Sequence, residues 1–481
     1  MSSDKGSFHL FRTGQFFPRN WVGFRPNGYG GKVAQIRDPV LPIFGLLCGF
    51  RKSPAGATLT FRAYLVWLIG LPPLLRWFPI LILVRPIADN LYFLKNVSPF
   101  LSPPYIIGVL TPVLCAIALL SFKYPNRSKI DRAATWWGLA ILIAIIGLII
   151  YDPLSLISLE FVLKLGLPIY LFFFLRIFIT DLQDFRGILQ STIYAAIFVA
   201  AVMLYELLVN PIGVQESRGL ERIQGGFGDV VSYGMYVIFS LIIASYFYFV
   251  RQKGEIAHYG MGTMIAVIVL GVLALVNIHH TATYSIFTLI LGLFFLYQFR
   301  QKAPVSGIIL LLLLGLAMSY WGSLIVEERI SPLLQTDLEV ISGDKDSDRL
   351  LHGRVGRWRK MLEIFVTQPL WVQFFGYSFQ SKPPYSLIGI GAHNDFIRIL
   401  FATGFFGLIC YLRFLAVSLA RLAKVRALER FLLIGIFLSL LFYSISVTPT
   451  FYAPFMYIAM AAIAFLALPE EKLTQWNRNE S

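Results

Sequence analysis

Long apolar runs recur along the chain, and several approach or exceed the roughly 20 residues that a helix needs to cross a bilayer. Apolar residues make up 57% of the sequence and charged residues only 14%, whereas a soluble domain has about 25% charged residues. These features exclude a soluble multi-domain protein. We therefore predict an all-α polytopic membrane protein.

The runs predict about twelve transmembrane helices. Their approximate ranges are 63–84, 104–122, 134–151, 154–178, 187–209, 229–250, 260–278, 281–299, 304–322, 395–415, 429–447 and 451–468. The range 63–84 is the weakest of them, because it contains Arg76 and the pair Pro72-Pro73.

Basic residues lie in every second connection between these runs, as the positive-inside rule predicts for cytoplasmic connections. They are Arg51, Lys52 and Arg62, then Lys123, Arg127, Lys129 and Arg132, Arg176 and Arg186, Arg251 and Lys253, Arg300 and Lys302, and finally Arg421, Lys424, Arg426 and Arg430. The alternation explains the net charge of +15 without a nucleic-acid partner.

The same alternation predicts the domain organisation. We expect a cytoplasmic tail with an interfacial segment at 1–62, nine membrane helices in 63–322 and a large outward loop at 323–394. Three further membrane helices in 395–468 and a cytoplasmic tail at 469–481 follow. Both termini are expected in the cytoplasm.

Ionisable residues near the membrane are costly and mark function by default, and here they gather at the predicted outward face. Glu160 and Lys164 are spaced i,i+4 and are expected to pair on one helix face. The other members of this group are Glu206, Glu216, Arg218, Glu221, Arg222, Asp229, His279, His280, Asp395 and Arg398. We therefore expect a reaction or binding site at the outward face.

A helix at 354–366 is predicted within the large outward loop. Trp358, Met361, Leu362 and Phe365 recur at i, i+3, i+4 and i+7, which is one apolar stripe. Basic residues surround this stripe: Arg354, Arg357, Arg359 and Lys360. The guanidinium groups could clamp a phosphorylated lipid head group, or they could be cations that snorkel over anionic lipid.

His393 directly precedes the helix predicted from 395. Its imidazole could take a proton from a sugar hydroxyl near neutral pH. Alternatively, Asn394 or Asp395 caps the helix and His393 is an ordinary interfacial residue. The pair His279-His280 has no cysteine or carboxylate companions at metal-ligand spacing, so packing or substrate contact is preferred there to a metal site.

These residues resemble the bacterial O-antigen polymerase and O-antigen ligase family. The resemblance rests on Gly353-Arg354, Trp358, Pro369-Leu370, Gly376, His393-Asn394, Gly404 and Gly407, and on the earlier segment Arg222–Phe227. The sequence departs from the family pattern at His280-Thr281-Ala282-Thr283, where an arginine is usual, and in the stretched interval between Pro369 and Gly376.

The resemblance implies a glycosyltransferase of the bacterial inner membrane, similar in fold to the GT-C class. Its donor would be a glycan on undecaprenyl diphosphate, transferred with inversion and without metal or cofactor. Arg222, Arg354 and His393 would carry the reaction. Further substrate-binding candidates are Arg218, Arg357, Asn394, Asp395, Arg398 and His280. Implied partners are membrane lipids, a glycan acceptor, a flippase and chain-length regulator proteins.

The resemblance leaves the acceptor open. A polymerase extends another lipid-linked repeat of an O-antigen, capsule or exopolysaccharide, whereas a ligase transfers the glycan to lipid A core or another anchor. We favour the polymerase. A secondary transporter is the rival class, but transporters favour midplane charges and internal repeats, and neither is visible here.

Overall fold

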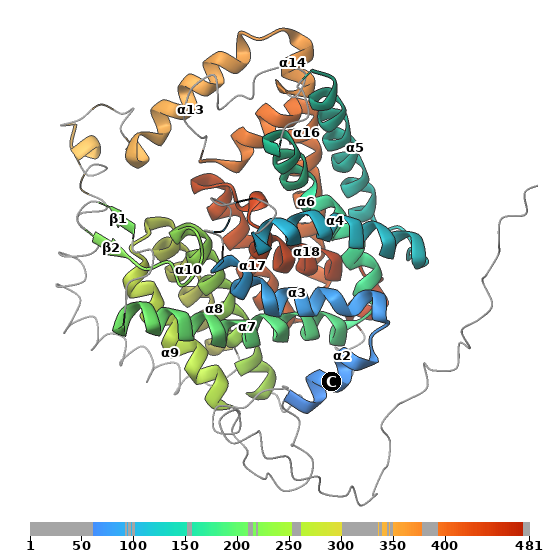
Figure 1. The fold of residues 1–481 in the computed structure, drawn as a ribbon, viewed down its shortest axis with the longest axis vertical. Coiled ribbons are helices and arrows are strands. Elements are labelled where there is room, and N and C mark those ends of the chain that lie inside the picture. The colour runs from blue at the N-terminus through green and yellow to red at the C-terminus, as the bar shows by residue number, and fades with distance from the viewer. Residues whose placement is uncertain are drawn as a thin grey trace, which may run out of the picture. The chain divides into compact units, whose positions relative to one another are not determined.

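The computed structural model describes residues 61–91, 94, 98, 102–151, 156–209, 215–217, 220–252, 261–300, 335, 339–343, 346, 350–377 and 393–474. All of them belong to one compact unit, Leu46–Ser481. The elements in the first half are α2 (Phe61–Gly70), α3 (Pro73–Asp89), α4 (Pro103–Ser121), α5 (Lys129–Tyr151), α6 (Leu156–Phe178), α7 (Leu182–Leu208), β1 (Gln215–Ser217) and β2 (Leu220–Arg222). They are followed by α8 (Val230–Gln252), α9 (Met261–Ile278), α10 (Thr281–Arg300), α13 (Leu350–Val366), α14 (Leu370–Phe375), α16 (Asp395–Ala420), η7 (Arg421–Lys424), α17 (Ala427–Ser446), η8 (Pro449–Phe451), α18 (Ala453–Leu466) and α19 (Glu470–Thr474) (Figure 1).

Eight helices in the described part of the chain are long and apolar enough to cross a membrane. They are α4, α5, α6, α7, α8, α10, α16 with η7, and α17, and two shorter apolar helices lie within α9 and at α18. A small antiparallel hairpin of β1 and β2 stands between α7 and α8. The predicted class, a helical polytopic membrane protein, is confirmed. The expected span at 304–322 lies outside the described residues.

The prediction of one continuous helix over 63–84 is wrong. Helix α2 ends at Gly70, and Pro73 begins the separate helix α3. Neither Pro72 nor Pro73 has an N–H to donate to a carbonyl of the preceding turn. The Arg76 guanidinium instead donates from Nε to Leu71 O at 2.7 Å. An arginine that looked out of place in an apolar run therefore satisfies backbone at the break.

Helix α18 lies at the centre of the unit and contacts α3, α6, α7, α8 and α17. Every residue from Phe455 to Leu466 is buried. Alanines at 459, 461, 462 and 464 let the neighbouring helices approach closely, as small residues do in membrane proteins. The predicted range 451–468 begins at the last residue of the 3-10 turn η8 and contains this 14-residue helix.

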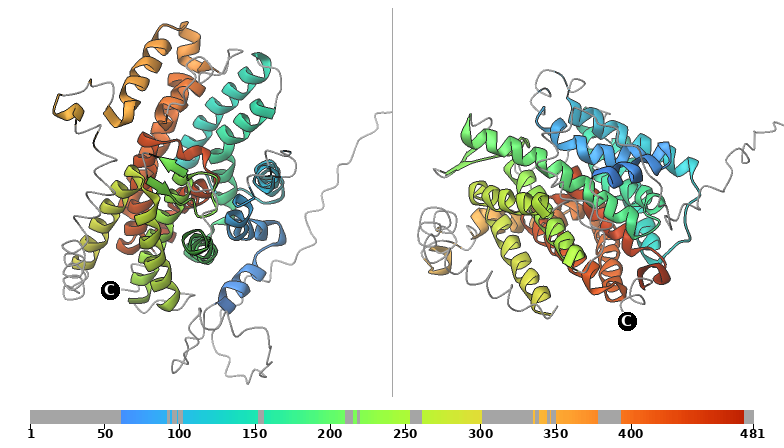
Figure 2. Two further views of the ribbon diagram at one scale, coloured as in Figure 1. Left: turned by 60° about the vertical axis from the view of Figure 1, so that its left-hand side comes forward. Right: turned by 90° about the horizontal axis from the view of Figure 1, so that it is seen from below.

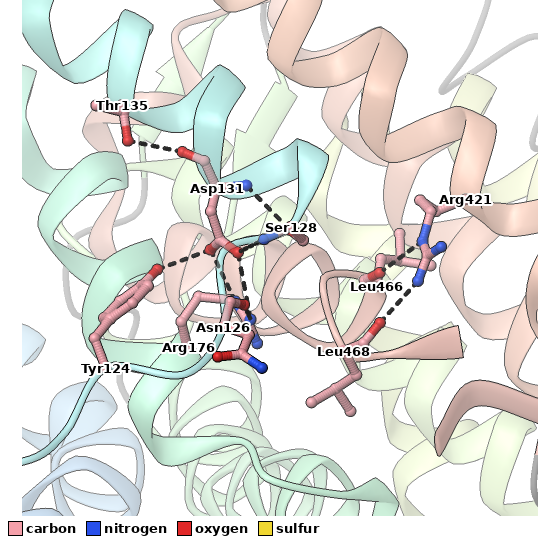
Figure 3. A network of polar contacts seen from close by, with 9 residues as sticks. All are labelled: Tyr124, Asn126, Ser128, Asp131, Thr135, Arg176, Arg421, Leu466 and Leu468. Carbon is pink, nitrogen blue, oxygen red and sulfur yellow. Dashed lines mark hydrogen bonds and ion pairs between the residues drawn. The ribbon is translucent and has the colours of Figure 1, made fainter. Parts of the chain in front are cut away.

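A buried ion pair joins α5 to α6 (Figure 3). The Arg176 guanidinium donates from Nε to Asp131 Oδ1 at 2.9 Å, and the two side chains are each only 1% exposed. Tyr124 and the Ser128 amide also donate to this carboxylate, at 2.7 and 2.6 Å. Removing one partner of such a pair costs about 3–5 kcal/mol, because the other charge is left buried. Arg176 therefore fixes the packing of two helices.

In the same view, Arg421 donates to Leu466 O at 3.3 Å and to Leu468 O at 2.7 Å (Figure 3). These carbonyls belong to the end of α18 and the turn that follows, where helical partners run out. Arg421 thus holds the end of α18 against the end of α16.

Candidate functional site

The predicted Arg helix is present as α13 and begins at Leu350, four residues before the expected start. Met361 and Phe365 are buried and share a small cluster with Ile397, Leu400 and Phe401 of α16, with Trp358 and Ile364 packed at its edge. Leu362, the remaining member of the predicted apolar stripe, does not pack into this cluster, and its side chain is 40% exposed. Ile364, which is partly buried, packs against this cluster instead.

Two glycines lock α14 against the first half of α16, and Figures 1 and 2 show these helices side by side. Gly376 ends α14 with φ +93°, and a Cβ there would lie 2.6 Å from the carbonyl of Ala402 and the amide of Thr403. Gly404 makes a non-helical kink within α16, at φ +66° and ψ −171°. A Cβ on Gly404 would overlap the backbone of Phe374 and Phe375. Both positions therefore require glycine.

This interlock positions the candidate site. It fixes the connection after α13 to the helix that begins just beyond His393. The glycines quoted in the family resemblance thus have a structural explanation, which is the close approach of two backbones.

His393 stands immediately before α16 with a positive φ of 45°. Asn394 is the N-cap of α16, and its Oδ1 accepts from the Ile397 amide at 3.1 Å. The capping alternative is therefore correct for Asn394. It does not exclude a role for His393, because the cap fixes the backbone that carries the imidazole.

Asp395 and Arg398, which were expected to bind substrate, are engaged inside the protein. Arg398 donates from Nε to Asp395 Oδ1 at 2.9 Å and also donates to Thr450. Thr450 donates from Oγ1 to Asp395 Oδ1 at 2.8 Å. The guanidinium lies 3.4 Å from the ring centroid of Phe451. This network ties the start of α16 to η8, so it holds His393 in place; substrate binding by either residue stays a prediction.

Charges on two separate segments, α13 and the residues just before α8, act on His393. Desolvation lowers its pKa below the usual value of 6.5, and the positive charges of Arg354 and Arg357 lower it further. The carboxylate of Asp229 acts in the opposite direction. The fold thus brings predicted residues of α13 and the start of α16 together. Asp229 was noted in the sequence only as a member of the outward polar group, since nothing in the pattern pairs it with His393.

The segment after β2 is held at both ends. Ile223 donates its amide to Asn277 O at 3.2 Å, and Glu206 accepts from the amides of Gly225 and Gly226 at 2.8 and 3.0 Å. Asp229 then accepts from the Tyr452 hydroxyl at 3.1 Å. Half-buried Arg222 is the last residue of β2 and directly precedes this segment. Arg218 lies outside the described residues.

His280 joins a chain of hydrogen bonds between helices. Its Nδ1 is 2.9 Å from Thr283 Oγ1, which is 3.0 Å from the hydroxyl of Tyr443. Its neighbour His279 is buried and lies 3.3 Å from the Tyr284 hydroxyl. Among the described residues, no group of three or more His, Cys, Asp or Glu side chains could hold a metal ion.

The predicted pair of Glu160 and Lys164 is confirmed, with 2.6 Å between Nζ and Oε1. It lines a cavity of about 370 Å³ that also borders Asp229 and Tyr452. Sequence reasoning missed this cavity, because α3, α4, α6 and the segment from 448 to 454 form it together.

The fold and site define a class: a multi-pass helical membrane protein in which two arginines and a carboxylate act on one histidine at the start of a helix. Residues 279–412 match the family described as O-antigen ligase. This match supports membership of the chain in the O-antigen ligase and polymerase family. It covers α10, α13, α14 and the first part of α16, with Arg354, Arg357 and His393. No curated protein matches the chain.

Proposed function

We propose that the protein is a polysaccharide polymerase at the outer face of the bacterial inner membrane. It transfers a glycan from undecaprenyl diphosphate to a sugar hydroxyl at the end of another lipid-linked repeat. The observation that carries this proposal is the environment of His393, whose pKa is lowered by desolvation and by the positive charges of Arg354 and Arg357. That arrangement offers an anion site next to a neutral base.

The arginines are proposed to bind the diphosphate. Guanidinium groups make bidentate, permanently charged contacts to phosphate, and they stabilise the charge that grows as the bond from sugar to phosphate breaks. Arg354 and Arg357 come from α13, and Arg222 is proposed to complete the set from β2. The diphosphate leaves readily once its charge is held, so the reaction needs no strong general acid.

His393 is proposed to act on the acceptor. With its pKa lowered, the imidazole is neutral near pH 7 and can accept the proton of the attacking hydroxyl. The acceptor oxygen then bonds to the anomeric carbon, the bond from that carbon to the phosphate oxygen breaks, and undecaprenyl diphosphate leaves. The attack from the opposite face inverts the anomeric configuration, and no metal takes part.

The proposed topology follows the charge pattern of the connections. Both termini are proposed to lie in the cytoplasm and the loop at 323–394 in the periplasm, with about twelve crossings in a GT-C-like arrangement. The broken pair α2 and α3 takes the place of the first crossing.

O-antigen ligase is the second candidate, because the matching family carries that description. A ligase would use the same donor and the same three residues but would transfer the glycan to lipid A core or another anchor. The two candidates differ in their product.

The test compares His393→Ala, Arg354→Ala and Arg222→Ala with wild type in a host that lacks the gene. Envelope and secreted glycans are sized on gels. We expect each variant to reduce polymer formation by about a hundredfold or more, as loss of a general base or of charge stabilisation does. Lys360→Ala is the matched control, because Lys360 is an exposed cation on the same helix.

The size pattern separates the candidates. Wild type that restores a ladder while the variants leave single repeats supports the polymerase. If the variants still form polymer on the lipid carrier but the polymer never reaches an anchor, the ligase is supported. Normal glycans in all three variants, at normal protein levels, would overturn the glycosyltransferase proposal.

A further inference from the structure

The cavity beside Asp229 is built from parts of the chain that the family match does not cover. Its walls are α3, α4, α6, the start of α8 with the residues before it, and the segment from 448 to 454. All of these lie outside 279–412. With about 370 Å³ it is large enough to receive part of a substrate.

The charges on its wall are unsuited to a diphosphate. Arg85 is 2.9 Å from Asp89, and Lys164 is 2.6 Å from Glu160, so each cation faces a carboxylate on its own helix. Asp229 adds a third carboxylate to these two ion pairs. Both cations of the wall are therefore compensated by carboxylates, and the wall has no surplus of positive charge with which to bind a diphosphate. An uncharged group with many hydroxyls needs no such surplus and can donate to the carboxylates.

Aromatic rings and hydroxyls complete the wall. Tyr105 donates to Glu160 Oε2 at 2.5 Å, and Tyr452 donates to Asp229 Oδ2 at 3.1 Å. The ring of Phe451 has the Arg398 guanidinium at 3.4 Å and Lys164 Nζ at 5.8 Å from its centroid. Arg398 thus covers one face of Phe451. The rings of Tyr105 and Tyr452 are therefore the ones that can offer apolar surface next to fixed acceptors. Sugars present the matching surface, with apolar C–H faces edged by hydroxyls.

Asp229 connects this cavity with the candidate catalytic histidine. Asp229 lines the cavity. Its carboxylate also raises the pKa of His393, whereas Arg354 and Arg357 lower it. We propose that the cavity is a saccharide subsite, which binds sugar residues of the lipid-linked glycan while its diphosphate stays at the arginines. This inference rests on the proposed function, and it adds a specificity site in the part of the chain outside the family match.

Gly108 provides a direct test, because it lines the cavity and a Cβ added there meets no atom within 4 Å. The Cβ of Gly108→Leu therefore has room, and we expect the rest of the leucine side chain to reduce the volume of the cavity. Gly292→Leu is the matched control, since Gly292 also lies within a membrane helix with no atom within 4 Å of an added Cβ, and it does not line the cavity. Tyr105→Ala is a second variant, which enlarges the cavity and removes a ring.

Two probes are bound to purified protein in nanodiscs: undecaprenyl diphosphate alone, and the same carrier with one glycan repeat, isolated from the deletion host. Wild type and Gly292→Leu should bind the glycan-bearing carrier at least about tenfold more tightly, a difference of about 1.4 kcal/mol. Gly108→Leu and Tyr105→Ala should lose most of this preference and bind the bare carrier within about twofold of wild type.

Two results would overturn the subsite. Either both cavity variants keep the full preference for the glycan, or they weaken the bare carrier as much as the glycan-bearing one. Only variants with melting temperatures within a few degrees of wild type are compared, so that a loss of binding does not reflect unfolding. The proposed function fails separately, if His393→Ala and Arg354→Ala turn over the glycan-bearing carrier as fast as wild type.

Discussion

His393 combines a strained backbone with a rigid support. Its φ of 45° is unusual for a residue other than glycine, and the neighbouring Asn394 and Asp395 are both buried and hydrogen-bonded. Strain of this kind persists only where the surroundings hold it, and it concentrates at functional positions. The backbone that carries His393 is thus held in place, and the charges of Arg354, Arg357 and Asp229 act on its imidazole.

The pH dependence of the reaction should report this environment. Because desolvation and two arginines lower the pKa of His393, the acid limb of kcat/KM should have its midpoint below 6.5. Arg357→Gln removes one of these positive charges, so the pKa of His393 should rise and the midpoint should move to higher pH. Asp229→Asn should move it to lower pH. The profiles are measured from about pH 4.5 to 8, the range in which histidine titrates.

The variants are compared by the pH midpoint of the acid limb and not by the maximal kcat/KM, because Arg357→Gln is also expected to weaken donor binding under the proposal. Lys360→Ala should leave the midpoint unchanged, because Lys360 is not among the charges that act on His393. Identical midpoints for wild type, Arg357→Gln and Asp229→Asn would show that another group controls the acid limb.

At the scale of elements, the contact between α14 and α16 depends on Gly404. Its φ of +66° and its contact with the Phe374 backbone leave no space for a Cβ. We expect Gly404→Ala to destabilise the protein by about 2–5 kcal/mol, from backbone strain and overpacking together. Thermal unfolding in detergent measures the loss, and glycan assembly should fall with it because α13 loses its support.

Gly292→Ala is the control for this change. It lies within α10, where an added Cβ meets nothing, so its stability should stay unchanged or rise by up to about 1 kcal/mol from helix propensity. Equal melting temperatures for Gly404→Ala and wild type would contradict the interlock.

Sequence periodicity predicted most of these elements, since a membrane helix must be long and apolar whatever it packs against. It placed α13 correctly as a helix, but it could not say which apolar residues pack on α16, because the partner of the stripe was unknown; Ile364 packs there and Leu362 is exposed. It also missed the break before Pro73, where a side chain from the next turn satisfies the free carbonyl. Of the candidate site, the helix α13 and the place of His393 just before α16 were predicted from the sequence, and the roles of these residues stay predictions. The cavity was not predicted, because five distant segments must meet to form it.

For the whole molecule, the charge pattern has two physical origins. Arg176 and Arg186 were counted among the basic connections, but Arg176 is buried against Asp131 and Arg186 pairs with Glu429 at 3.2 Å. These residues hold helices together. The orientation signal is then carried by exposed cations, which among the described members of these connections are Lys123, Arg127, Lys129, Arg132, Arg251, Arg300 and Lys424. They lie in the same alternating connections, so the expected orientation is unchanged.

Cysteine labelling tests this orientation. In a chain with Cys48, Cys115 and Cys410 replaced by alanine, Ile341→Cys and Lys123→Cys are compared, because both positions are exposed. A membrane-impermeant maleimide should label Ile341→Cys in intact spheroplasts and Lys123→Cys only after lysis. The reason is that 341 belongs to the loop proposed to face outward and 123 to a basic connection. The reverse pattern would place α13 and His393 on the cytoplasmic side. The proposed transfer at the outer face would then be wrong even if the residues of the site are correctly assigned.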